Sequence, residues 1–344
     1  MTALPSAVQA PPSAPELLDR CRVLVRPALT EAVGRLHPWV AEMAGYSFGW
    51  CEVGGAPAGA SGGKGVRQAL AVLGARAAGA DGRAGVPAAV AVELVHAFSL
   101  LHDDIMDGDA TRRRRPAVWK AYGTGPAVLA GDALFALAVE TLAAAPGGAR
   151  SLRLLSAALS DLVRGQADDL LFAARPFTGP ERVTPVEYRV MAEHKTGALL
   201  GCAAALGASL GGAPGPAVAA LDRAGRHLGV AFQLVDDVLG IWGDPAVTGK
   251  PAGGDLRERK KTFPVLAALD SPAAARRLPA LLDSPGREAE AADLIEAAGG
   301  RAAALAEARR LTAEARTLLT RPPLAEDAVG GILRLVDHLA GREL

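Results

Sequence analysis

Apolar residues recur every three to four positions over long stretches of this chain, and polar residues fill the positions between them. This spacing is typical of amphipathic helices, because about 3.6 residues complete one helical turn. Stretches rich in glycine and proline separate the periodic segments, and no convincing run alternates as a strand does. The pattern predicts helices over residues 16–35, 64–79, 87–107, 126–145, 149–174, 185–210, 215–242, 262–277, 286–298, 301–319 and 325–341. We therefore expect an all-α bundle.

The domain organisation follows from what separates these helices. Residues 1–15 are rich in proline and alanine and are expected to form a disordered tail. Segments 54–63 and 244–254 are expected to be flexible loops, but neither has the composition of an interdomain linker. The chain has 344 residues, of which 50% are hydrophobic, so it has enough apolar material for a large core. We expect one domain over residues 16–344.

Bulk charge and cysteine usage narrow the function classes. The 37 acidic and 37 basic residues cancel, so nothing indicates a partner bound by net charge, such as nucleic acid. Cys21, Cys51 and Cys202 are odd in number and widely spaced, which indicates neither a disulfide framework nor a zinc site. The first residues lack the basic and apolar regions of a signal peptide. We expect a cytoplasmic protein.

No transmembrane segment is expected. A membrane-spanning helix needs roughly 18 apolar residues or more without a charge. Residues 127–145 come closest, but Asp132 and Glu140 interrupt them.

A cluster of carboxylates ends the helix predicted over residues 87–107. Asp103 and Asp107 are four residues apart and therefore share a helix face, with Asp104 beside them. Crowded carboxylates repel unless a cation neutralises them, and Mg²⁺ prefers carboxylates, water and substrate phosphates as ligands. The run of arginines at residues 112–115 then supplies donors that match phosphate oxygens. The pattern favours metal-bridged diphosphate. An acidic helix end followed by a solvated basic loop is the alternative.

A second stretch repeats this arrangement. The apolar run over residues 215–242 carries Asp236 and Asp237 near its end, with Gln233 three residues before Asp236. Gly240 stands where a third aspartate would complete the motif, and Asp244 lies where the helix is expected to end. We expect Asp236 to bind metal and Asp237 to support it, and leave the part of Asp244 open. Basic residues follow again, namely Lys250, Arg257, Arg259, Lys260 and Lys261.

With these two motifs the chain resembles the trans-type isoprenyl diphosphate synthases, also called polyprenyl synthetases. The resemblance extends to four further segments, in the order of that family: residues 62–67 (GGKGVR), 93–96 (ELVH), 165–170 (GQADDL) and 194–197 (HKTG). The resemblance runs from about residue 62 to residue 264. Within the family, the chain is most like a short-chain geranylgeranyl diphosphate synthase. Taken alone, each segment has an ordinary structural explanation, such as a flexible turn at Lys64 or a core histidine at His96.

The resemblance implies a fold and an activity. The fold would be the single large helical bundle of the isoprenoid synthases, with a central active-site cavity. The activity would be the condensation of isopentenyl diphosphate with an allylic diphosphate of five to fifteen carbons, with about three Mg²⁺ ions per active site. A homodimer would also be usual for the family.

The resemblance also assigns residues to roles. The metal ligands would be Asp103, Asp107 and Asp236. Isopentenyl diphosphate would be held by Lys64, Arg67, His96 and Arg113. The allylic diphosphate and its departure would involve Asp104, Arg112, Lys195, Thr196, Gln233, Lys250 and Lys260. Gln166 and Asp169 would lie near the allylic site, while Arg114 and Arg115 are expected to be solvated charges.

Product length is expected to depend on Phe98 and Ser99. Phe98 lies five residues before Asp103, about 7.5 Å along a helix axis. A single aromatic residue at this position resembles the pattern of family members that make geranylgeranyl diphosphate. Farnesyl diphosphate and products of 25 or more carbons are the alternative products. Phe98 would otherwise be a core residue. A class I terpene cyclase and a non-catalytic subunit are the other functions considered.

Overall fold

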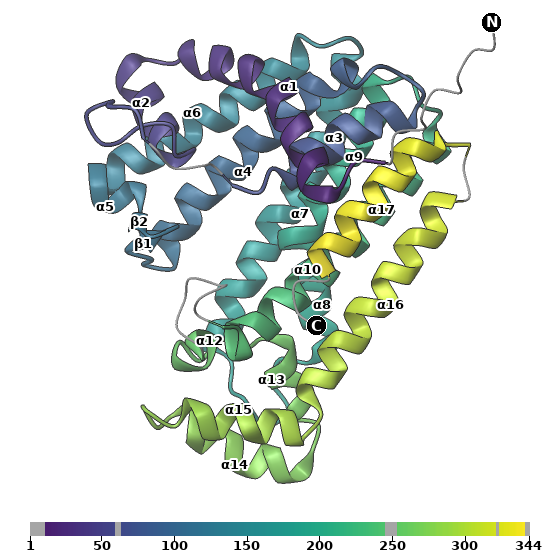
Figure 1. Ribbon diagram of the computed structural model, residues 1–344. Coiled ribbons are helices and arrows are strands. Elements are labelled where there is room, and N and C mark those ends of the chain that lie inside the picture. The colour runs from purple at the N-terminus through teal and green to yellow at the C-terminus, as the bar shows by residue number, and fades with distance from the viewer. Residues whose placement is uncertain (1–10, 59–62, 245–252, 321–322, 341–344) are drawn as a thin grey trace, which may run out of the picture.

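The structure, a computed structural model, describes residues 11–58, 63–244, 253–320 and 323–340. The described chain is nearly all helical, which confirms the expected fold class (Figure 1). The elements of its first half are α1 (Ala14–Gly34), α2 (Pro38–Ser47), α3 (Val66–Ala77), the 3₁₀ helix η1 (Gly82–Gly85), α4 (Val86–Met106), β1 (Thr111–Arg112), β2 (Arg115–Pro116), α5 (Val118–Tyr122), α6 (Thr124–Ala143) and α7 (Gly148–Ala174). The second half contains α8 (Pro185–Ala192), the π-helix η2 (Glu193–Gly197), α9 (Ala198–Leu210), α10 (Gly215–Trp242), α12 (Gly254–Arg257), α13 (Phe263–Ala268), α14 (Pro272–Leu282), α15 (Glu288–Ala297), α16 (Gly300–Thr320) and α17 (Glu326–Ala340).

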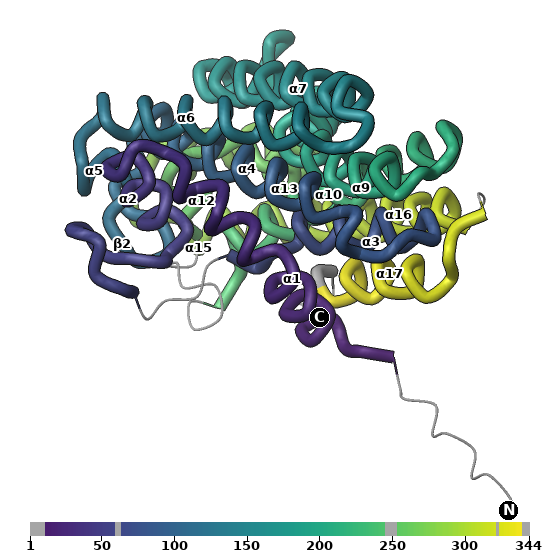
Figure 2. Tube along the Cα trace, turned by 90° about the horizontal axis from the view of Figure 1, so that it is seen from above, coloured from purple at the N-terminus to yellow at the C-terminus, as the bar shows by residue number. Residues whose placement is uncertain are grey.

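Helices α9 and α10 form the centre of the bundle. Helix α9 packs against α10 and α3, and α16 runs along α10 (Figures 1 and 2). The contact between α9 and α10 is close because glycines meet there: a Cβ on Gly225 would lie 2.6 Å from the Cα of Gly201. Small side chains therefore let these backbones approach, while Leu199 and Leu206 fill the space around them. Burying such a leucine is worth about 1.5–3 kcal/mol.

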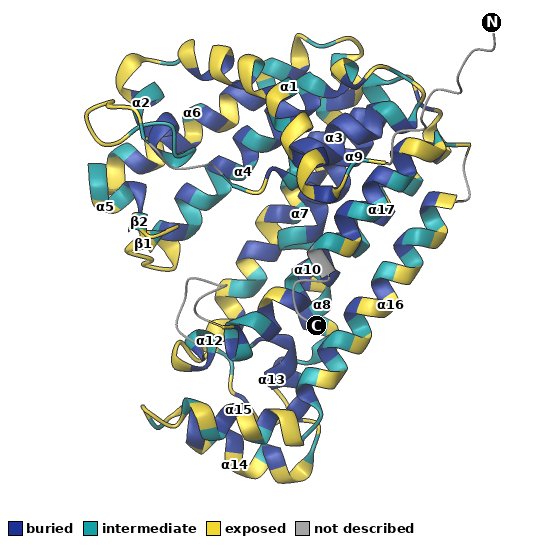
Figure 3. Cartoon of the chain, in the orientation of Figure 1, coloured by how far each residue is buried: buried dark blue, intermediate teal, exposed yellow. Residues whose placement is uncertain are grey.

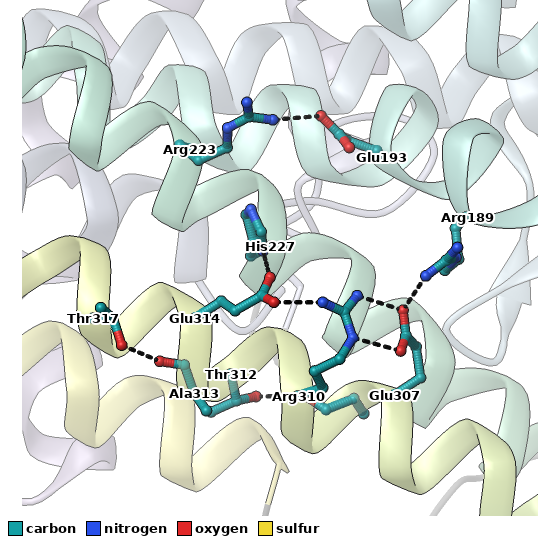
Figure 4. A network of polar contacts seen from close by, with 11 residues as sticks. Arg189, Glu193, Arg223, His227, Glu307, Arg310, Thr312, Ala313, Glu314 and Thr317 are labelled. Carbon is teal, nitrogen blue, oxygen red and sulfur yellow. Dashed lines mark hydrogen bonds and ion pairs between the residues drawn. The ribbon is translucent and has the colours of Figure 1, made fainter. Parts of the chain in front are cut away.

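The largest core cluster includes residues of α1, α3, α4, α6, α7, α9, α10 and α17. A second cluster joins α8, α10, α13 and α16, and a third joins the end of α10 to α12, α13, α14 and α15. Buried residues line the inner faces of these helices (Figure 3). Polar contacts help to attach α16 to the centre (Figure 4). Glu307 on α16 contacts Arg189 on α8 at 2.7 Å, and Glu314 contacts Nδ1 of His227 on α10 at 3.2 Å. Arg310 bridges the two glutamates. Exposed pairs are each worth about 0.2–1 kcal/mol, so packing remains the main attachment.

Several predicted boundaries were wrong. The helix expected over residues 262–277 is divided into α13 and α14, whereas the one expected over residues 185–210 has the predicted ends and contains the π-helical turn η2. Helix α2, the small hairpin of β1 and β2, and α5 were not predicted. The first helix begins at Ala14, inside the expected tail, because Ser13 and Glu16 form a capping box. Residues 1–10, 59–62 and 245–252, on which the tail and loop predictions mainly fall, lie outside the described residues.

Candidate active site

The C-terminal turn of α4 directs its carboxylates to two sides. Asp104 is 2% exposed, and its Oδ1 accepts hydrogen bonds from Nε and Nη2 of Arg112 at 2.7 and 2.6 Å. Asp103 and Asp107 instead face Lys195 and Asp169, whose charges act on both carboxyl groups. Consecutive helix positions are about 100° apart, which separates Asp104 from the other two. Asp103 and Asp107 therefore share a helix face, as their spacing indicates, while Asp104 forms an ion pair with Arg112.

Asp103 and Asp107 lie in a place that favours a cation. Burial raises the pKa of Asp103 to about 6, attraction to Lys195 opposes this rise, and repulsion from Asp107 adds to it. Burial also raises the pKa of Asp107, again against the attraction of Lys195. Both shifts mainly reflect the cost of keeping these carboxylates ionised away from water, which the nearby positive charges do not fully offset. A divalent cation would remove this cost.

Lys195 reaches this place from the π-helix η2. Its Nζ lies 2.5 Å from Oδ2 of Asp169 on α7, and its side chain is 25% exposed. A Cβ on Gly165 would collide with the backbone nitrogen of Lys195, and one on Gly229 would collide with Gly197. Helices α7 and α10 can thus approach η2 only through these glycines. Such π-helical turns are rare and frequently occur at functional sites.

A second group of cations lies on the other side of Asp104, around a cavity of about 560 Å³. Nη1 of Arg67 is 3.2 Å from Nε2 of His96, and the guanidinium of Arg113 fills the space beside Gly63, 2.7 Å from where a Cβ would stand. Lys64 lines the same cavity, with its ammonium 5.5 Å from the centre of the Phe232 ring. The four residues predicted for isopentenyl diphosphate thus surround one cavity.

The placement of Lys64 differs from the prediction. Helix α3 begins at Val66 after the left-handed Gly65 (φ 71°), so Lys64 precedes the helix that was expected to begin at residue 64. The side chain of Gln68 occupies the space beside Gly65, where a Cβ would collide with it. A larger residue would be strained at this position.

The electrostatics of this cavity favour a bound anion. Burial lowers the pKa of His96 well below its usual value, and the positive charges of Arg67 and Arg113 lower it further. His96 is therefore neutral near pH 7, and its Nε2 accepts from Arg67. Burial lowers the pKa of Arg67 and of Arg113, and the proximity of other arginines adds to this effect. Glu93 offsets part of the excess positive charge, since its carboxylate acts on both arginines.

The second acidic motif also divides its two leading aspartates. Asp236 is exposed and lines the cavity. Asp237 is 3% exposed and accepts hydrogen bonds from Tyr188 Oη (2.6 Å), Phe263 N (3.0 Å) and Gln233 Nε2 (3.1 Å). Burial raises the pKa of Asp237 to about 7 despite these donors. Asp237 therefore supports the motif from the core, and sequence patterns gave no signal for Tyr188.

Gln233 links this buried aspartate to η2. Its Oε1 accepts from the hydroxyl of Thr196 at 3.1 Å, while its amide nitrogen donates to Asp237. The chain of hydrogen bonds connects two residues assigned to the allylic site by resemblance. Gln166, assigned to the same region, is 7% exposed, and neither of its amide atoms has a hydrogen-bond partner within the structure.

The segment after α10 supplies further charged groups. Helix α10 ends at Trp242, as predicted, which leaves Asp244 exposed beyond its end. A Cβ on Gly240 would collide with the carboxylate of Asp255, so Asp255 occupies the space of the aspartate that the motif lacks. Lys260 contacts Glu258 at 2.7 Å, and its charge also acts on Asp107. Lys250 lies outside the described residues.

The prediction for Arg115 was wrong. Its side chain is 19% exposed, and its Nη2 donates to the backbone oxygen of Cys51 at 2.8 Å and to Glu52 at 2.9 Å. Arg114, in contrast, is exposed as expected.

Phe98 packs in a ring cluster between α4 and α6. Its ring centre lies 4.8 Å from that of His102 and 5.6 Å from that of Phe135. The neighbouring Ser99 is small and donates to the backbone oxygen of His96 at 3.0 Å.

Within the described residues, no three acidic, histidine or cysteine side chains converge as an all-protein metal site. Mg²⁺ needs only one or two carboxylates when water and phosphates complete its shell, so the donor set on α4 fits this ion. Residues Gly82–Met106 and Thr124–Ala143 have the length and apolarity of membrane helices, but both also pack in the bundle and do not show a membrane span.

The structure thus combines an all-α bundle with an acidic pair opposite a lysine and an adjacent cavity lined by cations. The model of the family described as polyprenyl synthetase matches residues 58–298, and the chain belongs to this family. It is 46% identical to a geranylgeranyl diphosphate synthase of Mycobacterium tuberculosis, over 83% of this chain and 82% of the relative. It is 43% identical to a (2E,6E)-farnesyl diphosphate synthase of the same species, over 95% and 93%. A crystal structure of a polyprenyl synthetase from Streptomyces coelicolor is 46% identical, with a TM-score of 0.88 over 94% of this chain and 98% of that one.

Proposed function

We propose that this protein is a Mg²⁺-dependent prenyltransferase that condenses isopentenyl diphosphate with an allylic diphosphate to give a short-chain, all-trans prenyl diphosphate. The observation that carries the proposal is the presence of two adjacent sites of different charge. One combines Asp103 and Asp107 with Lys195, and the other gathers Lys64, Arg67 and Arg113 around a neutral His96. Family membership supports the same activity, since prenyl synthases use these two substrates.

The acidic site suits the allylic diphosphate. Asp103, Asp107 and Asp236 would hold Mg²⁺, which when bound neutralises the negative charge that develops on the departing diphosphate. Lys195 and Lys260 place positive charge beside Asp107. Arg112, fixed by Asp104, presents its guanidinium between the two sites. Thr196 and Gln233 hold η2 to α10, and we extend the assignment to Lys250 from the sequence.

The cationic cavity suits isopentenyl diphosphate. Arg67 and Arg113 would bind its phosphate oxygens with planar donor pairs, and Lys64 would add a third cation. His96 is neutral and accepts from Arg67 at Nε2, so its Nδ1 carries the proton and can donate. Because the two sites adjoin at Asp104 and Arg112, the double bond of one substrate can be held against the allylic carbon of the other.

We further propose that the product is geranylgeranyl diphosphate. The allylic chain would extend from Asp103 along α4 towards Phe98, where the ring cluster with His102 and Phe135 closes the path. Ser99 leaves the position before this barrier small. Farnesyl diphosphate is the second candidate, since relatives with either product name share more than 40% identity with this chain.

We also propose that the chain acts as a cytoplasmic homodimer built on one domain. Helices α6 and α7 expose apolar side chains that a second copy would cover, namely Val128, Leu129, Phe135, Val163, Leu170 and Leu171. Exposed apolar patches of this kind mark interaction sites. Sedimentation of the purified protein would test this, and a monomer at micromolar concentration would contradict it.

The decisive experiment uses purified protein, Mg²⁺, labelled isopentenyl diphosphate and allylic diphosphates of five, ten and fifteen carbons in separate reactions. We expect a diphosphate product of twenty carbons from each starter. A fifteen-carbon product would favour the farnesyl alternative. Release of a hydrocarbon would indicate a terpene cyclase, and the absence of product with every starter would indicate a non-catalytic subunit.

A further inference from the structure

Arg115 uses its whole side chain to hold the hairpin against α2. Its guanidinium carbon lies 4.0 Å from the ring centre of Tyr46, and Nη2 donates to the backbone oxygen of Cys51 at 2.8 Å. Nη1 donates to the backbone oxygen of Tyr46 at 3.3 Å, and Glu52 supplies a carboxylate at 2.9 Å. Lysine cannot reproduce this combination, because stacking and several directed donors require the planar guanidinium.

A second contact reinforces the first. The hydroxyl of Tyr46 donates to the backbone oxygen of Pro116 at 2.8 Å, so the end of α2 holds both residues of β2. The other strand is held independently, because Arg112 on β1 is bonded to the buried Asp104. Each strand of the hairpin is therefore fixed to a different helix.

The tip between these strands is strained. Arg112 pairs with Arg115, and the two residues between them, Arg113 and Arg114, have φ angles of 52° and 63°. The left-handed conformation costs an L-residue with a side chain about 1 kcal/mol or more, and asparagine or glycine usually occupies such turns. Strain of this kind persists only where the surrounding contacts impose it. The contacts of Arg112 and Arg115 are the ones that do so.

The strained turn decides where Arg113 points. Its guanidinium occupies the space beside Gly63 and lines the cavity that contains Lys64 and His96. We propose that Arg115 is a positioning residue, which acts through Arg113 to set the affinity for isopentenyl diphosphate. This inference rests on the proposed function, and it deepens it by adding a residue outside the phosphate-binding set.

The two strands should respond differently to loss of Arg115. Arg113 depends on the turn, whereas Arg112 keeps its own bond to Asp104. The KM for isopentenyl diphosphate should therefore rise while the KM for the allylic diphosphate changes little. A general loss of structure would affect both.

The test compares Arg115→Met and Arg115→Lys with Arg114→Met, a matched control that removes one charge from the adjacent, exposed position of the same hairpin. Both Arg115 variants should raise the KM for isopentenyl diphosphate about tenfold, with less than about a twofold change for the allylic substrate. Arg114→Met should stay within about twofold for both. Titration calorimetry with isopentenyl diphosphate alone should show the same loss of affinity.

Tyr46→Phe keeps the ring but removes the bond to Pro116, and should shift the same KM in the same direction by a smaller factor, even if the Arg115 variants fold poorly. The inference is overturned if Arg115→Lys behaves like the wild type, if Arg114→Met matches Arg115→Met, or if both substrates are affected equally. Lack of incorporation by the wild type would instead contradict the proposed function. Incorporation with an unchanged KM in the Arg115 and Tyr46 variants would contradict the role of Arg115 alone.

Discussion

Lys195 on η2 pairs with Asp169 on α7 at a distance of 2.5 Å, directly across from the carboxylates that end α4. The lysine charge thus has a partner in the free protein and remains beside Asp103 and Asp107. A diphosphate brought by a metal ion would carry more negative charge than Asp169 and would compete for the same ammonium group. The pair holds the lysine in place for this exchange.

The pH dependence of activity should reveal this relationship. The pKa of Asp103 is about 6, so we expect kcat/KM for the allylic substrate to fall as the pH falls through about 6 and the carboxylate becomes protonated. Lys195 lowers this pKa, so Lys195→Met should move the acidic limb to higher pH. Lys195→Arg keeps the positive charge and should leave the limb near its original position. Profiles of kcat/KM at a fixed Mg²⁺ concentration well below that for half-maximal rate measure this, because saturating metal would itself keep Asp103 ionised, and a limb that stays in place in Lys195→Met would contradict it.

Asp103 and Asp104 are neighbours in sequence but should differ in their effect on metal dependence. Asp103→Asn removes an expected metal ligand and should raise the Mg²⁺ concentration for half-maximal rate by about tenfold or more. Asp104→Asn should change this concentration much less. It should instead lower the free energy of unfolding by about 1–2 kcal/mol, because Arg112 loses its buried charged partner. Mg²⁺ titrations and urea unfolding separate the two outcomes, and equal metal defects would show that Asp104 also binds the ion.

Asp237 should link stability to pH. Its pKa in the folded protein is about 7, above the usual value of 3.8, so the folded state binds a proton more tightly than the unfolded state. Its contribution is fully present below pH 3.8 and is lost as the pH rises through about 7. Asp237→Asn cannot ionise, so its stability relative to the wild type should increase from pH 5 to pH 8.

The matched variant Asp237→Ala should be less stable than the wild type at every pH. It leaves three hydrogen-bond donors without their acceptor and should lower the free energy of unfolding by about 3 kcal/mol. Chemical unfolding of both variants across the pH range provides the measurement. A constant difference between Asp237→Asn and the wild type would show that Asp237 does not titrate in this range.

Phe98→Ala should lengthen the product by at least one isoprene unit, because removal of the ring opens the path along α4. Phe135 would remain as part of the barrier. Val23→Ala is a suitable control, since Val23 is an exposed apolar residue of α1, outside both the ring cluster around Phe98 and the proposed dimer surface. Chromatography of the dephosphorylated products measures chain length. Unchanged length in Phe98→Ala would assign the floor to another residue, and the same change in Val23→Ala would indicate an indirect effect.

The sequence was sufficient for most of the fold and for the motifs. Helix α10 has the predicted limits because its apolar period is uninterrupted, and charged residues inside such helices mark the site. The π-helix at Lys195 was not predictable, since its extra residue depends on close contact with Gly165 and Gly229, which are distant in sequence. The local pattern of apolar and polar residues does not indicate contacts between residues that are distant in sequence.

Side-chain direction was the other missing information. Asp104 and Arg115 both appeared as members of charged runs, but each is committed to a partner that the motif does not include. The hairpin was missed for a related reason. Its tip consists of Arg113 and Arg114, which are not the residues that tight turns favour, so local turn preferences argue against it.

The left-handed backbone at the hairpin tip should reduce the stability of the protein. Arg114 has a φ of 63° and an exposed side chain, so glycine at this position would relieve strain without removing a buried contact. Arg114→Gly should therefore increase the free energy of unfolding by about 1 kcal/mol, while the greater freedom of glycine in the unfolded chain offsets part of the gain. Arg153→Gly is the matched control, because Arg153 is exposed and lies within helix α7. This substitution should lower the free energy of unfolding by about 1 kcal/mol. Urea unfolding measures both changes. Destabilisation of Arg114→Gly to the same extent as the control would mean that the left-handed turn is not strained.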